Sequence, residues 1–139
     1  MLLNPLSAQK AIPVEPYIAE AQQHYIANWK KSVRTLTHDS ADFIGLPYPY
    51  STPTLAGNQM FREMYYWDSY FINCGLLAYG SHPQRDGEST ADEKFAIQQA
   101  INNCNNLIYL LNKFGFVPNA NRFSMTNRSQ PPLLGAMIN

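Results

Sequence analysis

Aromatic and charged residues are mixed in the stretch FREMYYWDSYF, which covers residues 61–71. Six of its eleven residues are aromatic, and Arg62, Glu63 and Asp68 stand among them. This composition suits sugar binding, because the C–H face of a pyranose stacks on an aromatic ring while its hydroxyl groups need fixed carboxylate, amide or guanidinium partners. The neighbours Trp67 and Asp68 supply one group of each kind.

A plainer interpretation of the same stretch is a helix with a heavily aromatic core face. Two features oppose it. Aromatic residues at the adjacent positions 65, 66 and 67 cannot all face one core from a helix. Charged groups among them are also costly to bury unless they are paired or bound to a ligand.

A second unusual stretch, PNANRFSMTNRSQPP, covers residues 118–132. Taken alone it is more typical of plain turns, which Asn and Pro favour whatever the function. The two stretches bracket a predicted helical hairpin, so their loops can lie close in space. The second stretch then offers these amide and guanidinium groups: Asn119, Asn121, Arg122, Asn127, Arg128 and Gln130.

The rest of the sequence offers little other chemistry. Its 10 Lys and Arg balance 10 Asp and Glu without a basic block, which argues against binding to nucleic acid or a membrane surface. His24, His38 and His82 share no metal-ligand spacing with one another or with the cysteines, so neither a metal nor a cofactor is expected. Cys74 and Cys104 fall within helical patterns and are expected to be reduced thiols in the core.

Membrane insertion and export are not expected either. No apolar run reaches the length of a transmembrane helix. The first ten residues are too short and polar for the apolar segment of a signal peptide, and Pro5 interrupts them. We therefore expect a cytoplasmic location.

Helices must position the two stretches. Residues 1–14 show little periodicity and are expected to form an arm. From Glu15 onward, apolar residues recur at three- and four-residue spacing, which predicts a helix that ends between residues 35 and 39. Its expected apolar face consists of Ile18, Ala21, Tyr25, Ile26, Trp29 and Val33.

The aromatic stretch begins a second predicted helix. A proline-rich extended loop, residues 46–58, leads into it. The helix runs from about Trp67 to Gly80, and the polar residues 81–89 connect it to a third helix. The last predicted element follows Pro131 and Pro132, which suit a helix's first turn.

The third helix has the clearest signals. Thr90 and Glu93 form a capping box at its start, and Gly115 supplies a left-handed position at its end. Its expected apolar stripe consists of Ile97, Ala100, Ile101, Cys104, Leu107, Ile108, Leu111 and Phe114. Because no capping signal closes the final segment LLGAMIN, we expect a domain truncated at residue 139.

With these residues in view, the sequence resembles the trehalases, which are glycoside hydrolases built as an (α/α)6 barrel. FREMYYWDSYF is similar to the family signature that follows a glycine-rich turn. GFVPNANRFSMTNRSQPPLL is similar to the family block GxIPNGNRxYYLxRSQPP. The match spans roughly residues 15–139 and implies an all-α fold, with this chain forming the first few helices of an incomplete barrel.

The resemblance also implies roles for residues that match the family motifs. Sugar binding is expected at Trp67, Asp68, Asn119, Arg128, Ser129 and Gln130, with Phe61 and Tyr65 as walls of the glucose pocket. The residues of the two blocks are expected to line one concavity. Arg128 is expected to be partly buried and hydrogen bonded, because a guanidinium group held for a ligand must be pre-positioned.

The activity implied is the inverting hydrolysis of trehalose to glucose, which needs a carboxylic acid and a carboxylate base. In trehalases both groups lie well downstream, so no catalytic residue is expected before residue 139. Glu63 is expected to be structural. The small-molecule partner is expected to be trehalose or a related glucoside.

The sequence departs from the family pattern at two positions, of which the first bears on specificity and the second on the turn. Met60 stands where the family has an arginine, and Ala120 replaces a glycine. A related α/α-barrel glycosidase that acts on another glucoside is therefore one alternative. A small helical interaction domain, with the aromatic residues as core, is the alternative from another class.

Overall fold

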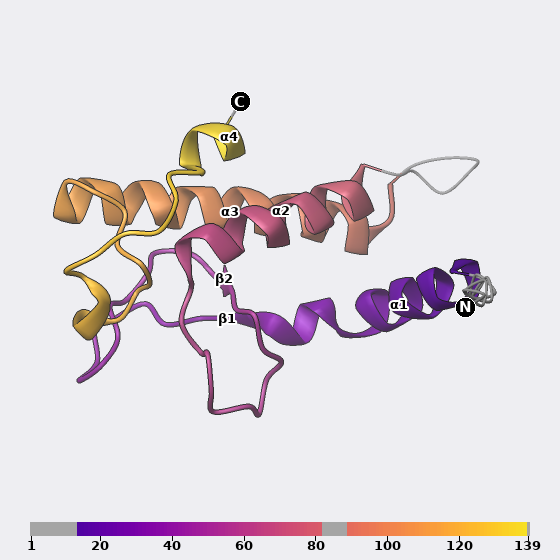
Figure 1. Cartoon of the computed structure of the whole chain (residues 1–139), viewed down its shortest axis with the longest axis horizontal. Coiled ribbons are helices and arrows are strands. Elements are labelled where there is room, and N and C mark those ends of the chain that lie inside the picture. The colour runs from indigo at the N-terminus through magenta and orange to yellow at the C-terminus, as the bar shows by residue number, and fades with distance from the viewer. Residues whose placement is uncertain (1–13, 82–88, 139) are drawn as a thin grey trace, which may run out of the picture.

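The computed structural model describes residues 14–81 and 89–138, which form a mainly helical structure (Figure 1). The expected arm, apart from residue 14, and most of the polar connection lie outside the described residues. Within these two ranges, none of the helices is long and apolar enough to cross a membrane. The all-α fold class is confirmed.

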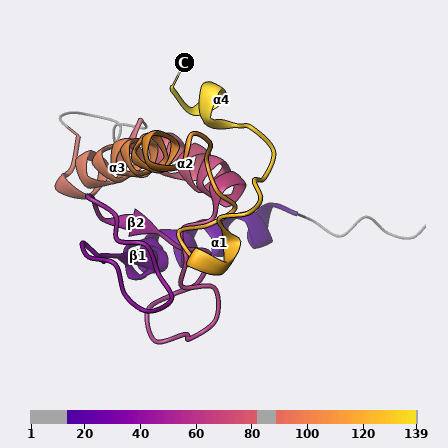
Figure 2. The same ribbon diagram turned by 90° about the vertical axis from the view of Figure 1, so that its left-hand side faces the viewer.

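Helices α2 (Tyr66–Gly80) and α3 (Ala91–Phe114) pack side by side in opposite directions. The two helices form one layer. Helix α1 and the short strands form a second layer along one side of it (Figure 2). Gly80 permits the close packing of the hairpin, since a Cβ atom there would lie 2.6 Å from Cγ1 of Ile97. The predicted extent of both helices is confirmed to within a residue or two.

The predicted ends of α3 are also confirmed. The Thr90 hydroxyl accepts a hydrogen bond from the Glu93 amide at 3.2 Å, and the Glu93 carboxylate accepts one from the Thr90 amide at 2.6 Å. Two otherwise unsatisfied backbone donors are thereby paired. Gly115 follows the helix with a φ of 77°, which a residue without a Cβ atom adopts readily.

The first helix is shorter than predicted. Helix α1 (Glu15–Asn28) is followed by a 3-10 turn, Trp29–Ser32, and by strand β1 (Val33–Arg34). Strand β1 pairs antiparallel with β2 (Tyr50–Ser51). The helix therefore stops because long-range backbone pairing replaces helical hydrogen bonds, and an apolar period cannot reveal such pairing.

The buried face of α3 is more polar than predicted. Gln99, Asn103 and Asn106 are fully buried, whereas Ile101 and Ile108 of the expected apolar stripe are exposed. In the side chain of Asn106, Oδ1 accepts a hydrogen bond from the backbone amide of Tyr48, and Nδ2 donates one to the Tyr48 carbonyl. Asn103 accepts from the amide of Ser51 at 3.0 Å. These side chains hold residues 48–51 onto the helix and satisfy a loop backbone that would otherwise be buried without partners.

Apolar packing is divided between two clusters. The larger lies under the loops that carry the two motif stretches, and consists of Ile44, Leu46, Tyr50, Met64, Tyr66, Leu107, Leu110, Val117 and Leu134. The smaller joins Trp29 to Leu76, Ala96 and Ala100. The larger cluster therefore supports the motif loops directly.

Two smaller expectations need correction. Helix α4 (Leu134–Ile138) begins after the prolines and not at them; its first residue, Leu134, donates its amide to the hydroxyl of Tyr66 at 3.0 Å. Both cysteines are free thiols, but Cys74 is exposed and Cys104 is only partly buried. The prediction that both thiols lie in the core is therefore wrong.

Candidate functional site

The two motif stretches meet at the start of α2. The backbone amide of Trp67 donates to Oε1 of Gln130 at 2.9 Å. The amide of Tyr66 donates to the carbonyl of Asn119 at 3.1 Å. Both donors belong to the first turn of the helix, where amides have no partner within the helix. The loop of residues 118–130 therefore caps the helix that presents Trp67 and Asp68.

Asn121 joins three loops beneath this meeting point. Its side chain is fully buried; Oδ1 accepts from the Met64 amide at 2.7 Å and Nδ2 donates to the Ile44 carbonyl at 2.9 Å. Its own backbone amide and carbonyl pair with the same two residues. One asparagine thus fixes the registration of both motif stretches.

An ion pair between a buried carboxylate and a partly exposed guanidinium group makes a second connection. Glu63 is 2% exposed, and its carboxylate lies 2.7 Å from Nη1 of Arg122. The other carboxylate oxygen accepts a 3.3 Å hydrogen bond from the hydroxyl of Tyr65. The guanidinium groups of Arg122 and Arg62 also each lie 5.1 Å from the ring of Phe43. The structural role expected for Glu63 is consistent with these contacts.

Sequence reasoning missed the roles of Arg122 and Asn121, although both stand in the second stretch. The available signal was the charge in the first stretch: a carboxylate among aromatic residues requires a partner when buried. The sequence could not show that Arg122 is this partner, because 59 positions separate it from Glu63.

Phe61 and Tyr65 help to line a hollow, and their role as walls of a glucose pocket stays a prediction. Their rings lie 6.2 Å apart in a tilted arrangement. The hollow has a volume of about 230 Å³, and its other lining residues are Phe43, Gln59, Met60, Arg62, Glu63 and Arg122. Burial, followed by the nearby Glu63 carboxylate, raises the pKa of the Tyr65 phenol, which favours a neutral hydroxyl at this wall.

Trp67 and Asp68 lie beside this hollow in sequence but do not line it. The Trp67 side chain is 43% exposed, so a large aromatic surface is available to a ligand. Asp68 is partly buried, and desolvation raises the pKa of its carboxyl group. A carboxylate held in this way has incomplete hydration and gains from hydroxyl donors.

The remaining predicted site residues surround the second stretch. Asn119 is partly buried, and Nδ2 lies 3.6 Å from the sulfur of Met125. The hydroxyl of Ser129 donates to the Val117 carbonyl at 2.7 Å, which fixes the loop. Gln130 is positioned by Trp67, as described above. That all these side chains line one concavity stays a prediction.

Arg128 differs from expectation. It is exposed, and its guanidinium group donates to the adjacent Asn127 side chain at 3.2 Å. The expectation of partial burial is wrong, because the described residues provide no surface over this side chain. Its backbone carbonyl still accepts from the Asn119 amide at 2.8 Å, so the loop is ordered around it.

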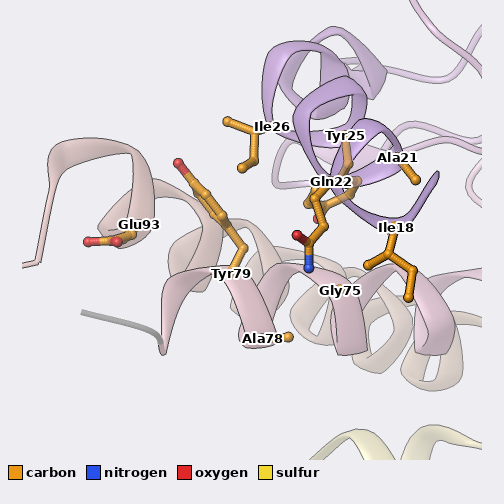
Figure 3. Close-up of a pocket in the computed structure, with 9 residues that line it drawn as sticks. All are labelled: Ile18, Ala21, Gln22, Tyr25, Ile26, Gly75, Ala78, Tyr79 and Glu93. Atoms are coloured by element: carbon orange, nitrogen blue, oxygen red, sulfur yellow. The ribbon is translucent and has the colours of Figure 1, made fainter. Parts of the chain in front are cut away.

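A larger hollow lies elsewhere. It has a volume of about 650 Å³ and separates α1 from the later part of α2 (Figure 3). Its lining is mainly apolar, with Ile18 and Ile26 on one side and Ala78 and Tyr79 on the other. Its carboxylate, Glu93, is already engaged in the cap of α3. Its other polar side chains are Gln22, Tyr25 and Tyr79, so this lining offers no carboxylate outside the helix cap.

Metal chemistry has no support in these parts of the chain. Residues 14–81 and 89–138 contain no group of three or more His, Cys, Asp or Glu side chains arranged to hold a metal ion. Sugar recognition by aromatic, amide and charged side chains is the chemistry that the meeting of the two stretches supports.

Comparison with known proteins identifies the family of this chain. The sequence profile of the family described as Trehalase matches residues 7–139. This chain belongs to the trehalase family. The match includes both stretches, so the hydrogen bond between Trp67 and Gln130 joins two segments of one trehalase-family domain.

Individual relatives give the same assignment. A periplasmic trehalase of Xanthomonas campestris is 36% identical over 119 residues, which are 84% of this chain and 18% of that protein. A trehalase of Dictyostelium discoideum is 30% identical over 90% of this chain and 19% of its own length. A probable trehalase of Oryza sativa is 44% identical over 56% of this chain and 11% of its own length. The matched region thus spans only 11–19% of these relatives' length.

The cytoplasmic location expected from the sequence is corrected by these comparisons. Relatives from Xanthomonas campestris and Pseudomonas aeruginosa are named periplasmic trehalases. The expectation rested on the first ten residues, which lie outside the described residues.

Proposed function

We propose that this chain is the amino-terminal part of the catalytic domain of a longer glycoside hydrolase that cleaves trehalose to glucose. Family membership supports the class of enzyme, and relatives that are named trehalases support the substrate. The observation that carries the proposal for the site is the hydrogen bond between the Trp67 amide and Gln130, because it brings the two motif stretches together.

In this proposal the aromatic residues bind the apolar faces of the sugar. The exposed ring of Trp67 provides one stacking surface, and Phe61 with Tyr65 provides a second wall. Stacking alone does not orient a sugar, because every pyranose has an apolar face. The polar groups beside these rings must therefore determine which hydroxyl groups are accepted.

Asp68 and Gln130 are suited to that task. Asp68 is partly desolvated, so hydroxyl donors from a sugar restore lost hydrogen bonds. Oε1 of Gln130 is occupied by the Trp67 amide, which leaves Nε2 to donate to a sugar oxygen. Asn119, Arg128 and Ser129 complete the proposed polar rim from the same loop.

Catalysis is proposed to follow the inverting mechanism, in which an acid protonates the leaving oxygen while a base activates water on the opposite face. Glu63 is unsuited to either role, since it is buried and paired with Arg122. We propose that both catalytic carboxylates come from parts of the longer protein outside this chain.

A second candidate function is hydrolysis of a different glucoside. Met60, which replaces the family arginine, is 63% exposed and lines the hollow beside Phe61. A thioether cannot donate hydrogen bonds to a sugar as a guanidinium group does. A glucoside with an apolar group at this position is therefore a reasonable competitor of trehalose.

Glucose release by the full-length protein tests both functions. Trehalose and a panel of aryl and alkyl glucosides are supplied under identical conditions, and kcat/KM is compared. The proposed function predicts that trehalose is the preferred substrate. Proton NMR at early times also tests inversion, which yields one α- and one β-glucose from each trehalose. Preference for another glucoside supports the second candidate, and two α-glucose molecules exclude inversion.

An interaction domain remains the rival from another class. Its discriminating feature is the genomic reading frame after the codon for Asn139. A frame that continues with further helical hairpins and two carboxylate motifs supports the enzyme. A stop codon in intact genomic sequence contradicts it.

A further inference from the structure

Phe61 has an unusual backbone conformation. Its φ is 52°, and it is the one non-glycine residue with positive φ in the described part of the chain. A bulky side chain in the left-handed region is sterically strained, and such strain persists only where the surroundings enforce it. The ring is 52% exposed, so burial in the core does not compensate for the strain. Other contacts must hold this conformation.

Thr54 makes the contacts at the strained residue. Its hydroxyl oxygen lies 2.9 Å from the Met60 carbonyl and 3.1 Å from the Phe61 carbonyl, so the two carbonyls share its single proton. The preceding residue is held as well, since the Met60 amide donates to Oδ1 of Asn58 at 2.8 Å. One hydroxyl group thus spans the turn in which the chain direction changes before the aromatic stretch.

The loop that carries Thr54 is itself anchored. Nη2 of Arg34, on strand β1, donates to the carbonyls of Leu55 and Asn58 at 3.3 Å each. The Ala56 amide donates to the Lys31 carbonyl at 2.6 Å. Thr54 therefore has a fixed position relative to the strand pair, and can transmit that position to residue 61.

We propose that Thr54 is a positioning residue that holds Phe61 in the left-handed conformation and so presents its ring, with Tyr65, as a wall of the sugar site. The identity of the ligand rests on the proposed function. The tilted contact between the two rings, 6.2 Å between centroids, is the arrangement that this backbone conformation maintains. Strain at residue 61 is then tolerated because it sets the shape of the site.

A thermal-stability cycle tests the proposal without any sugar. Phe61→Gly and Phe61→Ala both remove the ring, but only glycine relieves the left-handed strain. In the full-length protein we expect Phe61→Gly to melt a few degrees above Phe61→Ala. In a Thr54→Val background this difference should vanish, because residue 61 is then free to adopt negative φ. Equal melting of the Gly and Ala variants in the parent background, or an undiminished difference in the Thr54→Val background, overturns the proposal.

Kinetics provide the second test. Thr54→Val should raise the KM for trehalose about tenfold with less than threefold change in kcat, since the wall binds the sugar but does not react. Thr54→Ser retains the hydroxyl and should restore KM. Thr37→Val, at an exposed threonine in another loop, is the matched control and should leave both constants unchanged. A Thr54→Ser variant as impaired as Thr54→Val contradicts the role of the hydroxyl.

The two tests separate this inference from the proposed function. If the full-length protein does not hydrolyse trehalose, the proposed function fails while the stability cycle still decides whether Thr54 holds Phe61. If trehalose is hydrolysed and the cycle shows no coupling, the positioning role alone fails. Should Thr54→Val not fold, Thr54→Ala replaces it in both tests, since it also removes the hydroxyl group.

Discussion

The amide of Trp67 and the side chain of Gln130, 63 positions apart, are joined by a 2.9 Å hydrogen bond. This contact uses a helix amide that has no acceptor within α2. The same contact therefore stabilises the start of the helix and positions Gln130 beside Trp67 and Asp68. The arrangement links local helix capping to the proposed recognition of a sugar.

Replacing Asn121 should destabilise the whole motif region. Asn121→Ala removes two buried side-chain hydrogen bonds, and leaves the Met64 amide and the Ile44 carbonyl each with one partner fewer. We expect a loss of about 2–6 kcal/mol, since each of the two unsatisfied buried groups costs about 1–3 kcal/mol. Denaturant unfolding of the full-length protein measures it. Asn112→Ala, at an exposed position on α3, is the control, and an equal effect of both changes would contradict the role given to Asn121.

Asp68 predicts a particular pH dependence of stability. Its pKa in the folded state is raised by desolvation above the usual 3.8, so folding disfavours the ionised form. Ionised Asp68 therefore lowers stability above the folded-state pKa, and this penalty disappears as pH falls below the unfolded-state value. Asp68→Asn should raise Tm at pH 7 but not near pH 3.

Thermal melts at a series of pH values check this sign. Glu20→Gln, at an exposed position on α1, is the control and should give the parent profile. An Asp68→Asn variant that is less stable than the parent at pH 7, or stabilised equally at pH 3, would show that desolvation does not govern this carboxyl group.

Met60→Arg should improve trehalose turnover by the full-length protein. The substitution introduces the guanidinium group of the family pattern at an exposed position beside Phe61. One charge-assisted hydrogen bond contributes about 1.5–3 kcal/mol, which corresponds to roughly 10- to 100-fold in kcat/KM. Met60→Lys tests whether charge alone suffices. Efficient hydrolysis by the parent, with Met60→Arg harmful, would mean that another residue has taken over this role.

The isolated 139-residue chain should associate or bind a hydrophobic dye. Exposed apolar side chains gather on its helices: Phe71, Leu77, Ile101, Ile108 and Leu111. Exposed apolar patches promote association. Ile101→Gln combined with Ile108→Gln should lower dye fluorescence several-fold, whereas Asn112→Gln should not. A monodisperse parent with a sharp cooperative melt and no dye binding would support an independent domain instead.

Local signals predicted part of this structure. Thr90, Glu93 and Gly115 define the limits of α3 because capping depends on residues within one turn. Motif similarity identified the two stretches, and their meeting at Trp67 and Gln130 agrees with the predicted proximity of their loops. The end of α1 was missed because the pairing of Val33 with Ser51 is long-range.

The buried face of α3 shows the limit of periodicity more clearly. Ile101 and Ile108 follow a regular apolar pattern, yet they are exposed. Asn103 and Asn106 are buried because they bind the backbone of a distant loop. An apolar stripe indicates a surface that favours burial, but it does not indicate which partner covers it. The strain at Phe61 likewise depends on Thr54, seven positions away, and has no signature in residue type.

Trehalose kinetics of Asp68→Asn in the full-length protein test the central claim most directly. The change is nearly isosteric, and it removes the charge that we propose accepts sugar hydroxyl groups. We predict at least a 100-fold loss of kcat/KM, as expected for about 3 kcal/mol of lost binding, with the melting temperature at pH 7 equal to or above that of the parent. Tyr17→Ala, at an exposed aromatic residue on α1, should retain parental kinetics. An Asp68→Asn enzyme that hydrolyses trehalose within threefold of the parent would contradict the assignment of the sugar site to the two joined stretches.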